Sequence, residues 1–147
     1  MARPRAGDWL EDEVSHWKSQ GVELVVSLLE REEVADLDLG NERGLCAAKG
    51  IEFRSLPIAD RGIPDDASAV KKLARDVALS QRVVVVHCRI GIGRSSLVAA
   101  AILCASGLEP DIAFAAIQKA RGVPVPDTAG QREWIERQRD HLALRQA

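Results

Sequence analysis

Cys88 and Arg94, six positions apart, are the residues of this sequence best suited to chemistry. They flank a short segment with two glycines, which joins a run of four valines (83–86) to an apolar segment (97–105). The valines predict a strand that is buried on both faces, and the apolar segment predicts a buried helix. A tight loop between a strand and a helix N-terminus binds anions, because backbone N–H groups converge there with the positive end of the helix dipole.

Such a loop would activate the cysteine as a nucleophile. A thiol attacks only as the thiolate, and a free cysteine has a pKa of about 8.5. Loop amides, a helix N-terminus and a guanidinium each favour the anion, and together they can bring the pKa below neutrality. We therefore expect Cys88 to attack the phosphorus of a phosphoryl group held above it. The groups that hold the phosphoryl oxygens are expected to be the Arg94 side chain and the backbone amides of Arg89, Ile90, Gly91, Ile92, Gly93 and Arg94.

Residues 87–95, HCRIGIGRS, contain the signature His-Cys-x5-Arg-Ser. On these residues the chain resembles the cysteine-dependent protein tyrosine and dual-specificity phosphatases, and the resemblance covers roughly residues 22–135. It implies hydrolysis of phosphate monoesters through a phosphocysteine on Cys88. It also implies that Ser95 hydrogen-bonds the departing thiolate in the second step. His87 is expected to orient the loop backbone, a role close to that of a satisfied core histidine.

A second chemical feature is the loop at 56–66, which contains two prolines, a glycine and three aspartates. Its Asp-x-Gly-x-Pro pattern resembles the general-acid loop of the same phosphatases, which places the acid at Asp60. Asp65 and Asp66 are expected to cap and charge the helix that follows. The larger tyrosine phosphatases have Trp-Pro before this aspartate, whereas an Ile-Ala pair stands here, and this difference concerns how the loop closes.

A third match is short. Residues 128–131 (TAGQ) resemble the segment in which tyrosine phosphatases place a water-positioning glutamine, which would make Gln131 that residue. The alternative is that Gln131 is a surface residue at a helix N-terminus. The sequence leaves both interpretations open.

The elements around these motifs predict an α/β fold in one domain, residues 1–147, with a frayed tail at 1–7. A small, mainly parallel sheet would have helices on both sides, and the phosphate loop would lie at the carboxyl end of the last strand. Asp8 is expected to cap the first helix, with Trp9 and Trp17 in the core. Strands are expected at 22–28, 51–56 and 83–87. Helices are expected at about 8–20, 30–38 (or a turn with a solvated acidic face), 41–49, 65–79, after the phosphate loop to 105, 110–121, and from Thr128 or Gly130 to near the C-terminus.

Composition excludes several classes of partner. The chain is 46% apolar with a formal net charge of −2, which argues against general affinity for nucleic acid or anionic membranes. Three cysteines, an odd number, predict a reducing compartment, and with no signal peptide and no long apolar run we expect a cytoplasmic location. We expect no metal ion and no cofactor, because an arginine and loop amides neutralise the phosphate charge and the three histidines are scattered. Nothing in the sequence indicates the oligomeric state.

The substrate class follows from what the pocket can contain. The sequence has no tyrosine, so the tyrosine-lined clamp of the larger phosphotyrosine-specific domains is absent in its usual form. A shallow, open pocket is expected, as in dual-specificity members, for a phosphorylated protein or a small phosphate ester. We rank protein phosphotyrosine first, phosphoserine or phosphothreonine second, and a small phosphorylated metabolite third. Two alternatives are a phosphate-binding module without turnover and a sulfurtransferase with a persulfide on Cys88.

Overall fold

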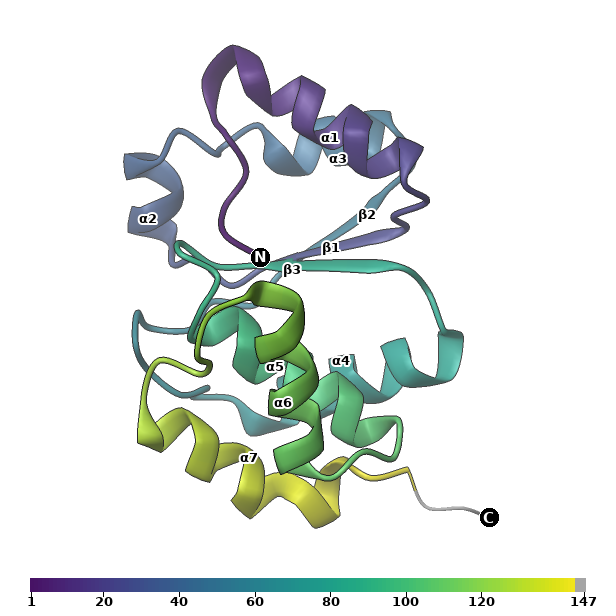
Figure 1. Cartoon of the computed structure of the whole chain (residues 1–147). Helices are drawn as coiled ribbons and strands as arrows, with labels where there is room; N and C mark the ends of the chain where they lie inside the picture. Colours follow the sequence, from purple (N-terminus) through teal and green to yellow (C-terminus); the bar gives the residue numbers. More distant parts are fainter. Residues whose placement is uncertain (145–147) are drawn as a thin grey trace.

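The chain is organised around a small parallel sheet, seen in the computed structural model, which describes residues 1–144 (Figure 1). Its three strands lie in the order β2 (Glu52–Ser55), β1 (Leu24–Ser27) and β3 (Val84–His87). Both neighbours run parallel to β1, with Leu24 opposite Glu52 on one side and opposite Val84 on the other. The expectation of an α/β fold with a small, mainly parallel sheet is therefore confirmed.

Helices cover both faces of this sheet. After a 3-10 turn at Gly7–Trp9 they are α1 (Leu10–Ser19), α2 (Arg31–Asp36), α3 (Glu42–Ala48), α4 (Ala67–Ser80), α5 (Arg94–Ala105), α6 (Pro110–Arg121) and α7 (Ala129–Leu142). Figure 1 shows α1, α2 and α3 on one side of the sheet and α4 to α7 on the other. No helix within the described residues is long and apolar enough to span a membrane.

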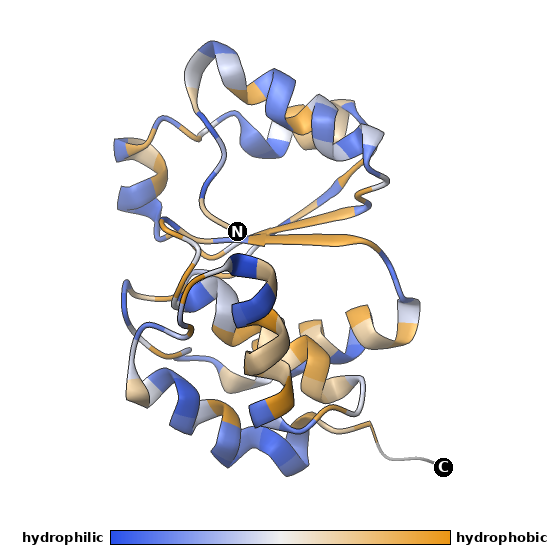
Figure 2. Cartoon of the chain, in the orientation of Figure 1, coloured by the Kyte–Doolittle hydropathy of each residue, from blue (hydrophilic) through white to orange (hydrophobic). Residues whose placement is uncertain are grey.

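The apolar core forms two clusters, one on each side of the sheet. Successive side chains of a strand point to opposite faces, so β1 contributes to both clusters. Val25 packs with Leu10, Val14 and Trp17 from α1. Val26 faces the other way, into the larger cluster that α4, α5 and α7 complete. Figure 2 shows β1, β3 and α5 as largely hydrophobic, whereas the surrounding helices also carry hydrophilic residues.

The position of β3 at the edge of the sheet changes the burial expected for its valines. Val86 and His87 are buried, whereas Val84 is only partly buried and Val83, just before the strand, is 49% exposed. Among the described residues only β1 forms a ladder with β3. The prediction of a strand buried on both faces is therefore wrong for its first half.

The first seven residues do not form the frayed tail that the sequence predicts. Their backbone bonds to the last part of β3 and to the loop after it: Met1 N donates to Val86 O (2.7 Å), Cys88 N donates to Met1 O (3.4 Å) and Arg3 N donates to Arg89 O (3.2 Å). An edge strand presents free N–H and C=O groups, and these groups account for the attachment.

The first helix begins differently from the prediction. Asp8 does not cap α1, because a 3-10 turn occupies residues 7–9 and precedes the helix. Trp17 is buried as expected, but Trp9 lies in that turn and is 58% exposed. The Arg5 guanidinium lies 4.8 Å from the centre of the Trp9 ring. Arg5 therefore covers a tryptophan that the sequence assigned to the core.

Replacing Leu97, which is fully buried on α5, with alanine is expected to lower the free energy of unfolding by about 2–5 kcal/mol, because it leaves a cavity. Leu79→Ala on α4 is the matched control, since Leu79 is 70% exposed and its loss is expected to cost within about 0.5 kcal/mol. Urea unfolding of both variants measures the difference. Equal shifts of the two midpoints would contradict the central position of α5.

Candidate active site

The phosphate loop, residues 88–94, connects β3 to α5 as predicted. Cys88 stands at its start and is only 3% exposed. The Gly91 N–H donates to Cys88 Sγ over 3.2 Å, and the Ser95 hydroxyl lies 3.4 Å from the same sulfur. Gly91 N donates to the sulfur, and the Ser95 hydroxyl can donate to it once the thiol is ionised, so both groups favour the thiolate.

Two opposing effects act on the pKa of Cys88. Burial is the largest and by itself raises the pKa. Hydrogen bonds from the Ser95 hydroxyl, the Ser95 N–H and the Gly91 N–H, together with the charge of Arg94, outweigh burial and hold the pKa below its usual value. This direction agrees with the expectation of an activated nucleophile.

The other two cysteines have the opposite character. Cys46 and Cys104 are buried and free. Burial, with a smaller contribution from the charge of a nearby glutamate, raises the pKa of Cys46 to about 12 and that of Cys104 to about 11. Cys88 is therefore the thiol of this chain that is chemically suited to react.

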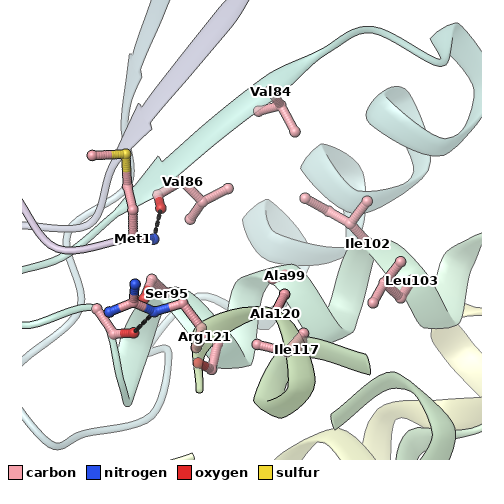
Figure 3. A pocket seen from close by; sticks show the side chains of 12 residues that line it. Met1, Val84, Val86, Ser95, Ala99, Ile102, Leu103, Ile117, Ala120 and Arg121 are labelled. Carbon is pink, nitrogen blue, oxygen red and sulfur yellow. Dashed lines mark hydrogen bonds between the residues drawn. The ribbon is translucent and has the colours of Figure 1, made fainter. Parts of the chain in front are cut away.

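The Arg121 side chain on α6 hydrogen-bonds to two backbone carbonyls of the phosphate loop. Arg121 donates from Nε to Gly91 O (3.0 Å) and from Nη2 to Ile90 O (3.4 Å). Figure 3 shows Arg121 and Met1 at one end of an apolar cavity of about 320 Å³ between β3, α5 and α6.

The phosphate loop also requires glycine at position 91. Gly91 has φ +82°, and a Cβ there would lie 2.3 Å from the backbone N of Ala2, so only glycine fits.

The Arg94 side chain is the most extensively bonded group of the site. Only 2% exposed, it forms a two-pronged pair with Glu33: Nη1 donates to Oε1 over 2.6 Å and Nη2 to Oε2 over 2.9 Å. Nη1 also donates to Ile58 O (3.0 Å), and Nη2 to Asp60 Oδ1 (3.2 Å). Burial lowers the pKa of Arg94, but the bonds to Glu33 outweigh this and raise it, and the bond to Arg94 keeps the pKa of Glu33 low.

The acid loop, residues 58–64, brings Asp60 beside the phosphate loop. Its turn is closed by the Gly62 N–H, which donates to Ala59 O over 2.8 Å, and Arg61 in this turn has φ +57°. Asp60 shares a pocket of about 60 Å³ with Cys88 and Arg94. The side chains expected to act as nucleophile, phosphate ligand and acid thus come from two separate segments and face one pocket.

The helix after this loop has the expected cap. Asp66 is the N-cap residue of α4, and its Oδ1 accepts a hydrogen bond from Ala69 N over 3.1 Å. The prediction for Asp66 is therefore confirmed. Asp65 is exposed and does not line the pocket that contains Asp60.

A buried pair lies behind Cys88. His87 is fully buried, and its Nε2 lies 2.6 Å from Oε2 of Glu42, which is itself only 2% exposed. His87 Nδ1 lies 3.4 Å from Cys88 O, and the Trp17 ring stacks on the imidazole with 6.4 Å between the ring centres. The imidazole is thus fixed by a carboxylate on α3 and lies against the backbone carbonyl of Cys88.

Gln131 is not the surface residue of the second interpretation. It is fully buried at the start of α7, where it forms a capping box with Thr128. Its Oε1 accepts from Asp127 N (3.1 Å) and Thr128 N (3.2 Å), and its Nε2 donates to Gly62 O (3.1 Å). It does not line the pocket of Cys88 and Asp60.

Sequence reasoning missed several residues of the site. Glu33 belongs to the acidic run that the sequence predicts to face solvent. Glu42 lies in a predicted short helix for which the sequence indicates no functional role. Asp127 lines the pocket and pairs with Arg61, with 3.1 Å between Oδ2 and Nε. Glu33 had one usable signal: its segment follows β1, and parallel strands end at the same edge of the sheet. For Glu42 and Asp127 no spacing in the sequence gives such a signal.

Comparisons with known proteins agree with this geometry. A family model described as "Polymorphic toxin system, DSP-PTPase phosphatase" matches residues 1–108. Cyclin-dependent kinase inhibitor 3 of Rattus norvegicus is 30% identical over 139 residues, which are 91% of this chain and 65% of that protein. The same protein of Homo sapiens is 29% identical over 138 residues, with the same two shares. The chain thus spans just under two thirds of the length of these relatives.

Solved structures show the same fold. Kinase associated phosphatase (KAP), crystallised with a serine in place of its catalytic site cysteine, superimposes with a TM-score of 0.84 at 25% identity, over 99% of this chain and 86% of that one. PTPMT1 has a TM-score of 0.74 at 22% identity, over 95% and 88% of the two chains, and shows the fold alone. Because the family model matches more than two thirds of the sequence, and its residues 1–108 include the whole signature at 87–95, this chain belongs to the DSP-PTPase phosphatases.

Proposed function

We propose that this chain hydrolyses phosphate monoesters through a phosphocysteine, with protein phosphotyrosine as its first substrate class. The observation that carries the proposal is the shared pocket of Cys88, Arg94 and Asp60. A nucleophile with a lowered pKa, a buried cation and an exposed carboxyl group are the three groups that this reaction needs. The family to which the chain belongs supports the same chemistry.

In the first step the Cys88 thiolate attacks phosphorus, and the bond from phosphorus to the leaving oxygen breaks. The amides of residues 89–94 and the Arg94 guanidinium stabilise the charge on the phosphoryl oxygens. Asp60 gives its proton to the leaving oxygen. A phosphoryl oxygen that binds Arg94 Nη2 would compete with the 3.2 Å bond to Asp60, and would thereby free the carboxyl group to face the leaving oxygen.

In the second step water attacks the phosphocysteine. Asp60 now removes a proton from the water, and the bond from sulfur to phosphorus breaks. The Ser95 hydroxyl, 3.4 Å from Cys88 Sγ, donates to the departing thiolate. Inorganic phosphate leaves, and the thiolate and the protonated Asp60 are restored.

The pocket suits a phosphorylated side chain that projects from a protein surface. Its lining includes Ile90, which is 66% exposed, and Arg61, whose side chain is 67% exposed, and its volume is only about 60 Å³. The similarity to a phosphatase named for its association with a kinase supports a protein substrate, and we rank phosphoserine or phosphothreonine as the second class. Asp60 and Ser95 would have no task in a sulfurtransferase, and Cys88 would have none in a binding module.

The proposed chemistry also bears on the compartment. Because Cys88 acts only as a free thiolate, we also infer a reducing compartment, which fits the cytoplasm.

Cys88→Ser is expected to lower phosphatase activity at least about 1,000-fold, because the nucleophile is removed. The wild-type enzyme is expected to keep full activity in excess EDTA, since Arg94 and the loop amides neutralise the phosphate. Release of inorganic phosphate from phosphotyrosine measures both. Activity that needs added magnesium, or that survives the substitution, would contradict the mechanism.

Alkylation of Cys88 by iodoacetamide is expected to reach half its maximal rate at a lower pH than that of an ordinary cysteine, because a lowered pKa leaves more thiolate at a given pH. Ser95→Ala removes a donor to the sulfur, so its pKa rises and the profile moves to higher pH. Cys46 and Cys104 are internal controls, since their raised pKa values leave them protonated at neutral pH. Mass spectrometry that finds Cys104 labelled first would overturn this assignment.

Asp60→Asn is expected to lower kcat/KM for phosphotyrosine by about 100-fold or more, because a general acid contributes typically 10²–10⁴-fold. An aryl phosphate with a strongly electron-poor leaving group needs no proton and is expected to lose much less. Asp65→Asn and Asp66→Asn are the controls, and we expect them to lower stability by at most the contribution of a helix cap and to leave the activity unchanged. If one of these controls showed the selective loss instead of Asp60→Asn, the acid would be misassigned.

A further inference from the structure

The end of the acid loop depends on another segment for its position. Its start is fixed by Ile58 N, which donates to Leu28 O over 3.0 Å. Asp60 is 66% exposed and accepts from Arg94, and the turn around it is closed by Gly62 N, which donates to Ala59 O. Within residues 1–144, two further polar contacts of this turn come from residues 127–131. Gln131 Nε2 donates to Gly62 O, and Arg61 pairs with Asp127.

The Gln131 amide has one orientation that satisfies its neighbours. Two backbone N–H groups, those of Asp127 and Thr128, point at its oxygen, so the oxygen must face them. The nitrogen is then directed at Gly62 O, two residues after Asp60. Because the side chain is fully buried and belongs to the capping box of α7, it cannot follow a movement of the acid loop without breaking these bonds.

The same amide also touches the phosphate loop. A Cβ on Gly93 would lie 2.9 Å from both Nε2 and Oε1 of Gln131, and 3.0 Å from the Cβ of Asp127. Gln131 therefore lies between the loop that carries Cys88 and the loop that carries Asp60, in close contact with the first and hydrogen-bonded to the second. It fixes the spacing between the two loops.

We propose that Gln131 is a positioning residue that fastens the acid loop over the phosphate pocket through the bond from Nε2 to Gly62 O. The proposal rests on the general-acid role proposed for Asp60. The pair of Arg61 and Asp127 acts as an outer attachment of the same loop, but both side chains are substantially exposed, and exposed ion pairs contribute little. The buried amide carries most of the effect.

This role differs kinetically from positioning the hydrolytic water. Water enters only after the leaving group has departed, and kcat/KM reports only the steps up to the first irreversible one. A glutamine that acts on water would change kcat and leave kcat/KM intact. A glutamine that positions Asp60 changes kcat/KM, and does so only for substrates whose leaving oxygen needs a proton.

Gln131→Glu tests the proposal with one atom changed. The glutamate keeps an oxygen that accepts from Asp127 N and Thr128 N, and Glu is favoured at this position of a capping box. It loses the donor to Gly62 O. We expect kcat/KM for phosphotyrosine to fall about tenfold, since small misplacements of catalytic groups cost up to about 100-fold, and kcat/KM for an electron-poor aryl phosphate to change less than about twofold.

Thr128→Ala is the matched control. It removes the oxygen that accepts from Gln131 N over 3.1 Å and weakens the cap, but leaves the bond to Gly62 O intact. It is expected to lower the Tm without selecting between the two substrates. If Gln131→Glu does not fold, as judged by circular dichroism, Gln131→Met, which is uncharged and of similar length, carries the same comparison.

The outcomes separate the two hypotheses. If Asp60→Asn is selective for phosphotyrosine and the Gln131 variant is not, or if the variant lowers kcat alone, the positioning role is wrong and the proposed function stands. If Asp60→Asn itself shows no selectivity, Asp60 is not the acid, and the positioning role fails with it. Selective loss in both, with none in Thr128→Ala, supports the proposal.

Discussion

The buried guanidinium of Arg94 is the charge on which the site depends. A buried cation is costly unless it is paired and fully hydrogen-bonded, and its partners here come from the segments that follow each strand. Glu33 follows β1, Ile58 O and Asp60 follow β2, and Arg94 itself follows β3 by way of the phosphate loop. Because parallel strands end at one edge of the sheet, a single charge ties the three segments together there.

The sequence predicted the parts of the site that are local, because the phosphate loop is one continuous segment whose strand, glycines and helix are adjacent. It also predicted Asp60 as a residue of the site, because the loop at 56–66 resembles the general-acid loop of the phosphatases. It could not predict Glu42, whose partner is 45 residues away, because an acidic side chain on a short helix ordinarily faces solvent. For Glu33, which is 61 residues from Arg94, the only signal was its position after a strand of the parallel sheet. The edge position of β3 was hidden for a similar reason: four valines predict a strand but not its neighbours.

The two glycines of the phosphate loop show how closely the site is enclosed. Both are required, for different reasons. Gly91 has a positive φ and lies against the backbone of the first two residues, whereas Gly93 has no positive φ and is needed because Gln131 and Asp127 occupy the space where a Cβ would be. The loop is therefore packed from two sides by segments distant in the sequence, and its shape is a property of the whole fold.

The separation of the three thiols has a consequence for oxidative damage. Peroxide reacts with thiolates, so it would convert Cys88 to a sulfenic acid before it reached the protonated Cys46 or Cys104. Cys104 lies ten residues beyond Arg94 along α5, about 15 Å at 1.5 Å per residue, and Cys46 lies on α3 in the other core cluster. All three cysteines are free in the structure, and neither Cys46 nor Cys104 is paired with Cys88. A thiol from outside the chain, such as glutathione, would then reduce Cys88 again, so the proposed activity would follow the redox state of its surroundings.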